Sequence, residues 1–540
     1  MDKTFRLISL FMFFHVASLL SGQVIEDIPT ELIGSNILVV TPDNLLSSLG
    51  GKWDVLPEAY NPNTHLGGYY REMWNVCEKT KEDGKSVYDW SDLEKKLRWC
   101  AERHTRVTMR LAQFLGYPYD EGILFQADDY TTNQLVDDDF LKSQGLNVNH
   151  KGQITRNDTL IKIGYPQKYF WEMVREGNYP MIAIQHEDDK YYEAFPNYNS
   201  EAFYKGWYNL QKNLAKWLEG KLRKEDGTVY LMNGKPIKRK FLIEVMQAGF
   251  VGMYGEGWIK TSGVFPDDLE KAYRYAEIYP NLFPDIPLSY PLAVSYDLQR
   301  YTLEGLKRLW SIRNKYGISG LYYDVIGQEN FHYYFNNSSV AGLLRQLEFD
   351  KRRIGGEGSG TYRSEDLRDL GNHAYNAHFS GVALHNFAIT GERNTPLAQK
   401  NWFQFKKLVG AQLYLSGNSI EKIKGNQYRF NFQLQNLGIT WVFSPFWQPY
   451  VIFRDKDGKE LSRKKLNFDV KKIAPNSQEK EQIGVVKDVA PFSFIIKIPK
   501  KTYTISFAII DLYGIYENYW LHNTGRTMYG EYVLGRLSEL

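Results

Sequence analysis

The chain has 540 residues, too many for one ordinary domain and enough for a large barrel with a smaller module. Its 66 basic and 63 acidic residues leave a net charge of +3 without a basic stripe, which excludes the usual electrostatic footprint of nucleic-acid binding. The aromatic content of 15% modestly favours carbohydrate binding, because sugar rings stack on aromatic side chains, although aromatic residues also fill cores.

Residues 1–22 have the pattern of a signal peptide. Lys3 and Arg6 provide the positive start, residues 7–20 are mostly apolar, and Ser21 and Gly22 suit a cleavage site. We therefore expect a secreted or periplasmic protein whose mature chain has no integral membrane segment. An N-terminal membrane anchor is the alternative.

The two cysteines, Cys77 and Cys100, could form a disulfide in an exported protein. The helix predicted to start near Asp89 places Cys100 about 16 Å along its axis. A disulfide needs Cα atoms within about 7 Å, so two buried thiols are the preferred prediction. The chain has no His/Cys cluster, and we expect neither a structural zinc site nor a cofactor.

From about residue 60 the pattern alternates between strands and helices. Residues 91–94 (SDLE) match a capping box and open the first helix, and residues 112–178 are interpreted as an insertion. Strands are predicted at residues 67–74, 107–111, 179–185, 241–246, 288–294, 318–326, 352–356 and 382–386. Eight alternations predict a (β/α)₈ TIM barrel over residues 23–410, the expected catalytic domain. A doubly wound sheet is the alternative, but no glycine-rich phosphate loop follows an early strand.

Beyond residue 410 the hydrophobic period changes to two. Apolar residues alternate with polar ones at 428–434, 451–453, 492–498 and 503–509, with turn signals between them. This pattern predicts an antiparallel β-sandwich over residues 411–540, which we interpret as an accessory domain.

Two glutamates follow predicted strands within glycine-rich stretches. Glu256 lies in the stretch 249–258 after the fourth strand, and Glu357 lies in 355–360 after the seventh. Active sites of such barrels lie where the strands end, and glycine lets the backbone approach a ligand closely. Two carboxylates can act as acid/base and nucleophile, or as acid and base around a water. Each glutamate alone could instead be a loop residue paired with an arginine.

This placement resembles the clan A glycoside hydrolases, which carry the acid/base after strand four and the nucleophile after strand seven. The chain also resembles an uncharacterised bacterial family of barrel-plus-sandwich proteins grouped with glycoside hydrolases. That second resemblance rests on YDWSDL at 88–93, YGEGW at 254–258, NW at 401–402 with LVGAQLYL at 408–415, and QNLG at 435–438. The resemblance implies a retaining glycoside hydrolase with Glu256 as acid/base and Glu357 as nucleophile.

One departure keeps other functions open. Many clan A enzymes have Asn before the acid/base, where this chain has Gly255. A non-catalytic glycan-binding protein on a glycosidase-like barrel is therefore the alternative, and a lyase or transglycosylase is a third hypothesis.

Other polar and aromatic residues at predicted strand ends are candidates for substrate binding. Asp324 is also the reserve nucleophile, and the acidic stretch 185–189 is interpreted as a solvated loop rather than a metal site. The predicted partner is an oligo- or polysaccharide, and the oligomeric state stays open. The predicted substrate-binding residues are Arg71, Glu72, Arg110, Tyr254, Trp258, Asp324, His385 and Asn386.

Overall fold

The structure is a computed structural model of the full chain. Its described part consists of residues 38–39, 68–81, 83–113, 123–124, 138–184, 191–249, 264, 269–291, 313–315, 317–318, 320–326, 354–358, 379–383, 396, 410–438, 440–475, 490–521 and 523–539. The signal-peptide prediction for residues 1–22 lies outside this part.

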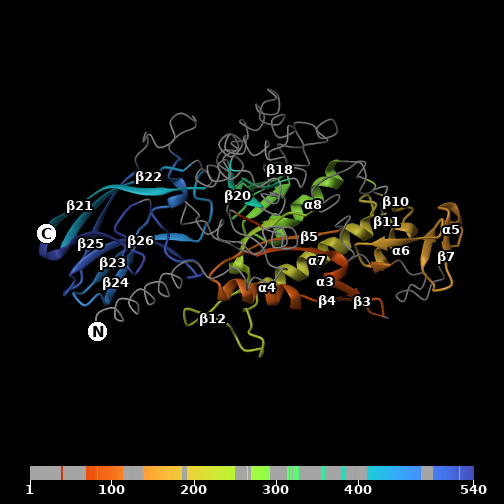
Figure 1. Ribbon diagram of the computed structural model, residues 1–540, viewed down its shortest axis with the longest axis horizontal. Coiled ribbons are helices and arrows are strands. Elements are labelled where there is room, and N and C mark those ends of the chain that lie inside the picture. The colour runs from red at the N-terminus through yellow and green to blue at the C-terminus, as the bar shows by residue number, and fades with distance from the viewer. Residues whose placement is uncertain are drawn as a thin grey trace, which may run out of the picture.

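Eight parallel strands form the central sheet, in the middle of the molecule in Figure 1. Their order is β1-β20-β19-β18-β15-β14-β5-β2, so each strand from β2 to β20 lies beside its predecessor among the eight. The strands are β1 (Leu38–Val39), β2 (Gly68–Met73), β5 (Val107–Ala112), β14 (Ile243–Gln247), β15 (Leu288–Pro291), β18 (Gly320–Ile326), β19 (Ile354–Gly358) and β20 (Phe379–Ala383).

This sheet confirms a mixed α/β fold, but it does not show a closed barrel. The β1–β20 ladder places the first strand beside the last, and no ladder between described residues joins β1 to β2. The predicted strand at 179–185 is wrong as a barrel strand, because β10 (Met181–Ala183) pairs antiparallel in another sheet. The sheet still has eight strands, because β1 was not predicted. Counted along the chain from β1, β14 is the fourth strand of the sheet and β19 the seventh.

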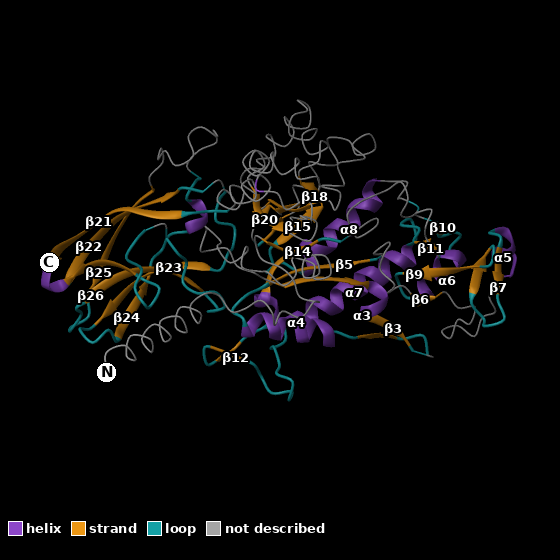
Figure 2. Cartoon of the chain, in the orientation of Figure 1, coloured by secondary structure: helices purple, strands orange, loops and turns teal. Residues whose placement is uncertain are grey.

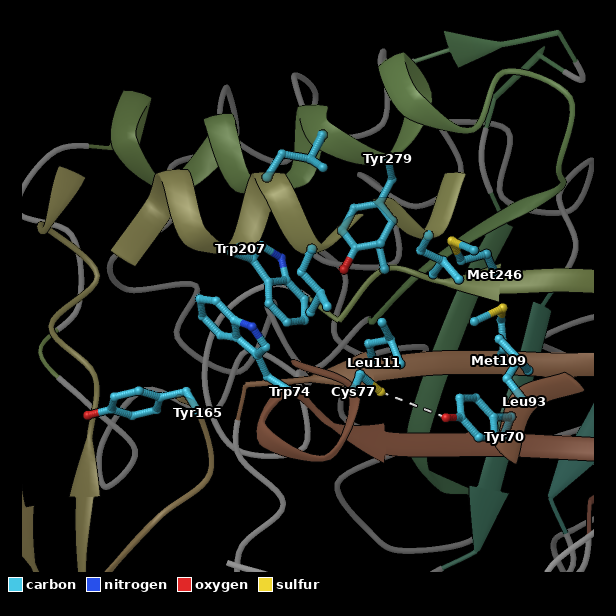
Figure 3. Packing of buried hydrophobic residues seen from close by; sticks show 14 of the residues in the cluster. Tyr70, Trp74, Cys77, Leu93, Met109, Leu111, Tyr165, Trp207, Met246 and Tyr279 are labelled. Atoms are coloured by element: carbon cyan, nitrogen blue, oxygen red, sulfur yellow. Dashed lines mark hydrogen bonds between the residues drawn. The ribbon is translucent and has the colours of Figure 1, made fainter. Parts of the chain in front are cut away.

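Helices cover one face of the sheet. The helices of this layer are α4 (Ser91–Glu102), α7 (Glu201–Leu218) and α8 (Leu269–Leu282). Alternate strand residues, such as Met109, Leu111 and Met246, are buried in the same apolar cluster as these helices. Figure 3 shows this layer, in which the Trp74 ring centroid lies 5.3 Å from that of Trp207.

Local interactions set where these helices begin. The predicted capping box of α4 is wrong: the N-cap is Trp90, and the Asp89 carboxylate accepts the Ser91 backbone N–H at 2.9 Å. At α7 the Ser200 hydroxyl accepts the Phe203 N–H at 3.0 Å, a standard N-cap. Gly206 lets α7 pack closely, since a Cβ there would overlap the Tyr169 ring.

A second, smaller sheet is inserted between β5 and α7. It lies at the right-hand end of the molecule in Figure 1. Its strands are ordered β10-β11-β9-β8-β7, and β6 pairs with β9. The elements are β6 (Ile123–Leu124), α5 (Asp138–Ser143), β7 (Leu146–Val148), β8 (Ile154–Arg156), β9 (Thr159–Ile163), α6 (Gln167–Arg175), β10 and β11 (Tyr192–Phe195). The predicted insertion therefore exists and extends beyond residue 178.

A buried carboxylate joins this insertion to the end of β2. Short α3 (Trp74–Cys77) and the hairpin β3 (Glu78–Thr80) and β4 (Ser86–Tyr88) follow β2 directly. The Glu78 carboxylate accepts hydrogen bonds from the Trp74 indole at 2.6 Å and the Tyr169 hydroxyl at 2.9 Å. Lys168 of α6 lies 3.3 Å from the same carboxylate. The Glu78 carboxylate therefore links α3, which follows β2, to α6 of the insertion, because it accepts hydrogen bonds from both helices.

The C-terminal strands form two antiparallel sheets around their own apolar core, as predicted (Figure 2). One sheet has the order β21-β22-β25 and the other β24-β23-β26-β27. They comprise β21 (Leu413–Lys424), β22 (Gln427–Asn436), β23 (Trp447–Arg454), β24 (Glu460–Lys465), β25 (Ala490–Lys497), β26 (Thr504–Asp511) and β27 (Tyr532–Arg536). The domain boundary at residue 410 stays a prediction.

The remaining elements are short. Hairpins are formed by β12 (Leu231–Met232) with β13 (Lys235–Pro236) and by β16 (Arg313–Asn314) with β17 (Gly317–Ile318), and 3₁₀ turns span Arg239–Leu242, Val470–Lys472 and Leu537–Glu539. Cys77 and Cys100 are buried and no disulfide links them, which confirms the preferred prediction. Within the described residues no helix is long and apolar enough to cross a membrane.

Candidate functional site

The two ends of the parallel sheet carry different side chains. The strands run in one direction, so all their carboxyl ends meet at the same edge, where parallel α/β proteins place their sites. At this edge, the face of the sheet opposite the helices is polar. Its buried polar residues alternate with the helix-facing ones and are Thr108 and Arg110 of β5, Gln247 of β14 and Ser289 of β15.

Arg110 is the most informative of these predicted site residues. Its side chain is only 1% exposed, although a guanidinium is among the groups least often fully buried. A buried charge is stable only when it is paired and hydrogen-bonded, so the Arg110 guanidinium is expected to have acceptor groups close by. The structure places Arg110 inside the protein, two residues before the end of β5, and its predicted role in substrate binding stays a prediction.

Gly249 holds the chain against Arg110 immediately after β14. A Cβ on Gly249 would overlap the Leu111 carbonyl oxygen and lie 3.1 Å from Arg110 Cγ. The Tyr279 hydroxyl donates to the Gly249 carbonyl at 2.6 Å, and burial raises the pKa of Tyr279, so the phenol keeps its proton. The glycine-rich stretch that contains Glu256 thus begins beside Arg110, and this close approach explains its first glycine.

The inserted sheet contacts the same stretch farther along the chain. Val264 accepts the Tyr198 N–H at 2.9 Å and donates its own N–H to the Pro196 carbonyl at 3.0 Å. Residues 196–198 directly follow β11, so this contact connects the insertion to the chain between β14 and α8. The insertion therefore contacts the chain that follows the carboxyl end of β14.

The other residues of strand β2 occupy two different positions. Arg71 is in register with Arg110 on the neighbouring strand, although its side chain lies outside the described part. Glu72 is half-buried, and its carboxylate accepts the Met73 N–H at 3.0 Å. It also raises the pKa of the buried Cys77 thiol, after the larger effect of burial, which places Glu72 near the helix side.

The candidate carboxylates are placed only by their strands. Glu357 is the fourth residue of β19, in register with Ala383, and Asp324 lies in β18. Their side chains lie outside the described part of the structure. Tyr254, Glu256, Trp258, His385 and Asn386 lie wholly outside the described part. Their roles stay predictions.

The opposite edge of the sheet contains a charge cluster that the sequence analysis missed. Arg106, just before β5, is completely buried and lies 2.6 Å from Asp511 and 3.9 Å from Glu244. The rings of Phe446 and Tyr516 lie 4.2 and 4.5 Å from its guanidinium carbon. Burial opposes the charge, but the acidic partners outweigh this effect and raise the Arg106 pKa.

Further contacts join the C-terminal sheets to this amino-end edge. Phe241 stacks on Tyr513 with ring centroids 3.7 Å apart, and His104 Nδ1 lies 3.2 Å from the Ile515 carbonyl oxygen. No sequence pattern predicts that Arg106 pairs with Asp511, about 400 residues farther along the chain. The only available hint was that Arg106 directly precedes a buried strand.

A metal site receives no support from the described part of the chain. Within it, no three His, Cys, Asp or Glu residues form a group that could hold a metal ion. The acidic stretch 185–189 lies outside it.

Comparisons with known proteins leave the family open. No protein-family model matches the chain, and no curated protein matches it. A solved protein of Bacillus halodurans C-125, provisionally named an alpha-N-acetylgalactosaminidase, aligns with 80% of this chain and 85% of its own. The aligned sequences are 8% identical and the TM-score is 0.23, too low to assign a fold or an activity.

Proposed function

We propose that this protein is a retaining glycoside hydrolase with Glu256 as acid/base and Glu357 as nucleophile. Its parallel strands would close into a (β/α)₈ barrel, and its substrate would be an oligo- or polysaccharide. The order of the eight strands is the observation that carries this proposal. It makes β14 the fourth strand and β19 the seventh, the strands that precede or contain the two glutamates.

Arg110 supports the presence of carboxylates at this edge. A guanidinium buried on the polar face needs acidic groups nearby, and Glu256, Glu357 and Asp324 belong to the strands or connections of the same sheet. In a retaining mechanism, a nearby cation would help to keep the nucleophile ionised while the acid/base carries its proton. Arg110 and its register neighbour Arg71 are the residues we propose for that role.

The test is an activity screen of the chain without residues 1–22 against a broad glycan panel, with matched variants. Glu256→Gln and Glu357→Gln should each lower kcat by about 10²–10⁴-fold on the substrate found. Glu102→Gln, which changes an exposed glutamate of α4, should leave the rate unchanged. Full activity in Glu357→Gln together with its loss in Asp324→Asn would assign the nucleophile to Asp324 instead.

The stereochemistry of the product tests the mechanism separately. Retention predicts carboxyl groups about 5–5.5 Å apart, whereas inversion requires about 6.5–9.5 Å for the intervening water. The anomer formed first, followed by NMR before mutarotation, should keep the configuration of the substrate. The inverted anomer would show that Glu357 acts as a base.

The alternative is a non-catalytic glycan-binding protein, which Gly255 favours because many related enzymes have Asn there. Under this alternative a glycan binds to the parallel-sheet region but is not cleaved. A cleavage product with an unsaturated sugar would instead indicate a lyase, and products longer than the substrate would indicate a transglycosylase.

We also propose export and a two-domain organisation. Residues 1–22 would be removed as a signal peptide, residues 23–410 would form the catalytic domain, and residues 411–540 would brace it. N-terminal sequencing of protein recovered outside the cytoplasm should begin near residue 23. An intact Met1 there would indicate an uncleaved membrane anchor, and protein found only in the cytoplasm would contradict export.

A further inference from the structure

We propose that residues 517–521 and 523–531, in the C-terminal sheets, form a second, non-catalytic binding surface for a polysaccharide chain. Two large aromatic side chains of this segment face solvent: Trp520 is 38% exposed and Tyr529 is 42% exposed. Each ring lies on a guanidinium, with Arg526 3.9 Å from the Trp520 centroid and Arg454 3.8 Å from the Tyr529 centroid. We name this surface the aromatic platform.

The supporting arginines are fixed, which keeps the rings in place. Arg454 binds both carboxylate oxygens of Glu531, which is 2% exposed. Arg526 donates to the Asn518 carbonyl at 3.1 Å, and the Asn518 amide donates to the Tyr529 carbonyl at 3.0 Å. The two ring-bearing parts of the segment are therefore one hydrogen-bonded unit, and little conformational entropy would be lost on binding.

The composition of the platform favours a sugar over a protein partner. A pyranose offers an apolar C–H face for an aromatic ring and hydroxyl groups at its edge for charged and amide side chains. Glu517, whose side chain is 73% exposed, lies 3.5 Å from Arg526 beside the Trp520 ring. Flat rings with polar groups beside them match this pattern, whereas a protein-binding core is typically depleted of glutamate, the residue type of Glu517.

The platform is distinct from the proposed catalytic edge. It follows residues 511–516, which contact the amino-end edge of the parallel sheet through Arg106 and Phe241. The proposed catalytic carboxylates belong to the carboxyl-end edge. A sugar bound at the platform is therefore held away from the site of cleavage, and binding can be measured without cleavage.

The test is native affinity electrophoresis of the full chain, carrying Glu357→Gln, in gels containing xylan, β-glucan, galactomannan, starch or pectin. Trp520→Ala and Tyr529→Ala should each weaken binding to the retarding polysaccharide about tenfold. Tyr503→Ala, which removes a ring 40% exposed on the same sheets, should bind like the parent. Thermal unfolding shows whether each variant is folded. If Trp520→Ala does not fold, the binding of Tyr529→Ala alone tests the platform.

Two results would overturn the platform: none of the five polysaccharides retards the parent chain, or both platform variants bind as well as the parent. Retardation lost in both variants, in a chain that cleaves no glycan, would support the platform while contradicting the proposed catalytic function. The two proposals can therefore fail independently.

Discussion

Arg106 and Arg110 are buried arginines four positions apart, the first just before β5 and the second within it, and their surroundings differ. Arg106 is enclosed by Asp511, Glu244 and two aromatic rings, and these contacts attach the C-terminal sheets. Arg110 lies on the polar face, beside Gly249 and the start of the stretch that contains Glu256. The same residue type, before and within one strand, thus lies among contacts to the C-terminal sheets in one case and beside the proposed site in the other, where its role is part of the proposal.

The largest effect should come from Arg106→Met. The substitution leaves Asp511 buried without its cation, which typically costs about 3–5 kcal/mol in the free energy of unfolding. Urea unfolding measures this loss. Because Asp511→Asn removes the nearer of the two carboxylates left without their cation, the double variant should recover part of the stability. Equal stability of Arg106→Met and wild type would show that the cluster is not structural.

Arg110→Met is the matched substitution at the other end of β5. We expect a loss of about 10²–10³-fold in kcat on the glycan substrate, the range seen when one preorganised charge is removed from a site. The free energy of unfolding should change by only about 1 kcal/mol, because charges in functional sites are not optimised for stability. Unchanged activity with a large loss of stability would show that Arg110, like Arg106, stabilises the fold and does not take part in catalysis.

Gly249→Ala tests how the stretch containing Glu256 is held. The added methyl group would overlap the Leu111 carbonyl oxygen, so the backbone must shift, at a cost of about 1–3 kcal/mol. Activity should fall more than stability, since the shift moves the segment beside Arg110. The control is Gly417→Ala, whose methyl group would meet only the Gln433 side chain at 3.5 Å. Equal behaviour of the two variants would contradict this account.

The smallest effect is expected at Asp285, between α8 and β15 at the amino-end edge. Hydrogen bonds from Lys240 at 3.0 Å and from Lys315 lower the pKa of Asp285. The carboxylate therefore stabilises the fold above its unfolded pKa of about 3.9, and this contribution is lost as the pH falls through its lower folded pKa. Asp285→Asn should cost less than about 1 kcal/mol at pH 7, because the side chain is partly exposed.

Urea unfolding between pH 7 and pH 3 measures this dependence. The difference between wild type and Asp285→Asn should shrink towards pH 3. A difference that stays constant over this range would mean that the ion pairs of Asp285 contribute nothing to stability.

The sequence predicted most strands but not all their partners. A largely apolar run identifies β14, and the alternation of Val107, Met109 and Leu111 identifies β5. The same signal misplaced residues 179–185, since a short apolar run does not reveal whether its neighbour is parallel or antiparallel. β1 was missed because it contains only two residues, Leu38 and Val39.

The candidate site was predictable only in part. Arg110 was a candidate because it lies near the end of a predicted strand, and the stretch that starts at Gly249 because glycines cluster after β14. Arg106 could not be identified, since its partner Asp511 lies far along the chain and only the folded structure brings them together. The roles of Glu256 and Glu357 remain predictions that rest on strand order and resemblance.

The two buried cysteines provide a reporter of local opening. Burial raises the pKa of the Cys77 thiol, so little reactive thiolate forms while the surrounding structure stays closed. An alkylating reagent can then reach Cys77 or Cys100 only during transient opening, and its rate measures the free energy of that opening. Cys77 follows β2 at the carboxyl-end edge and Cys100 lies in α4, so single-cysteine variants would compare how often the two regions open.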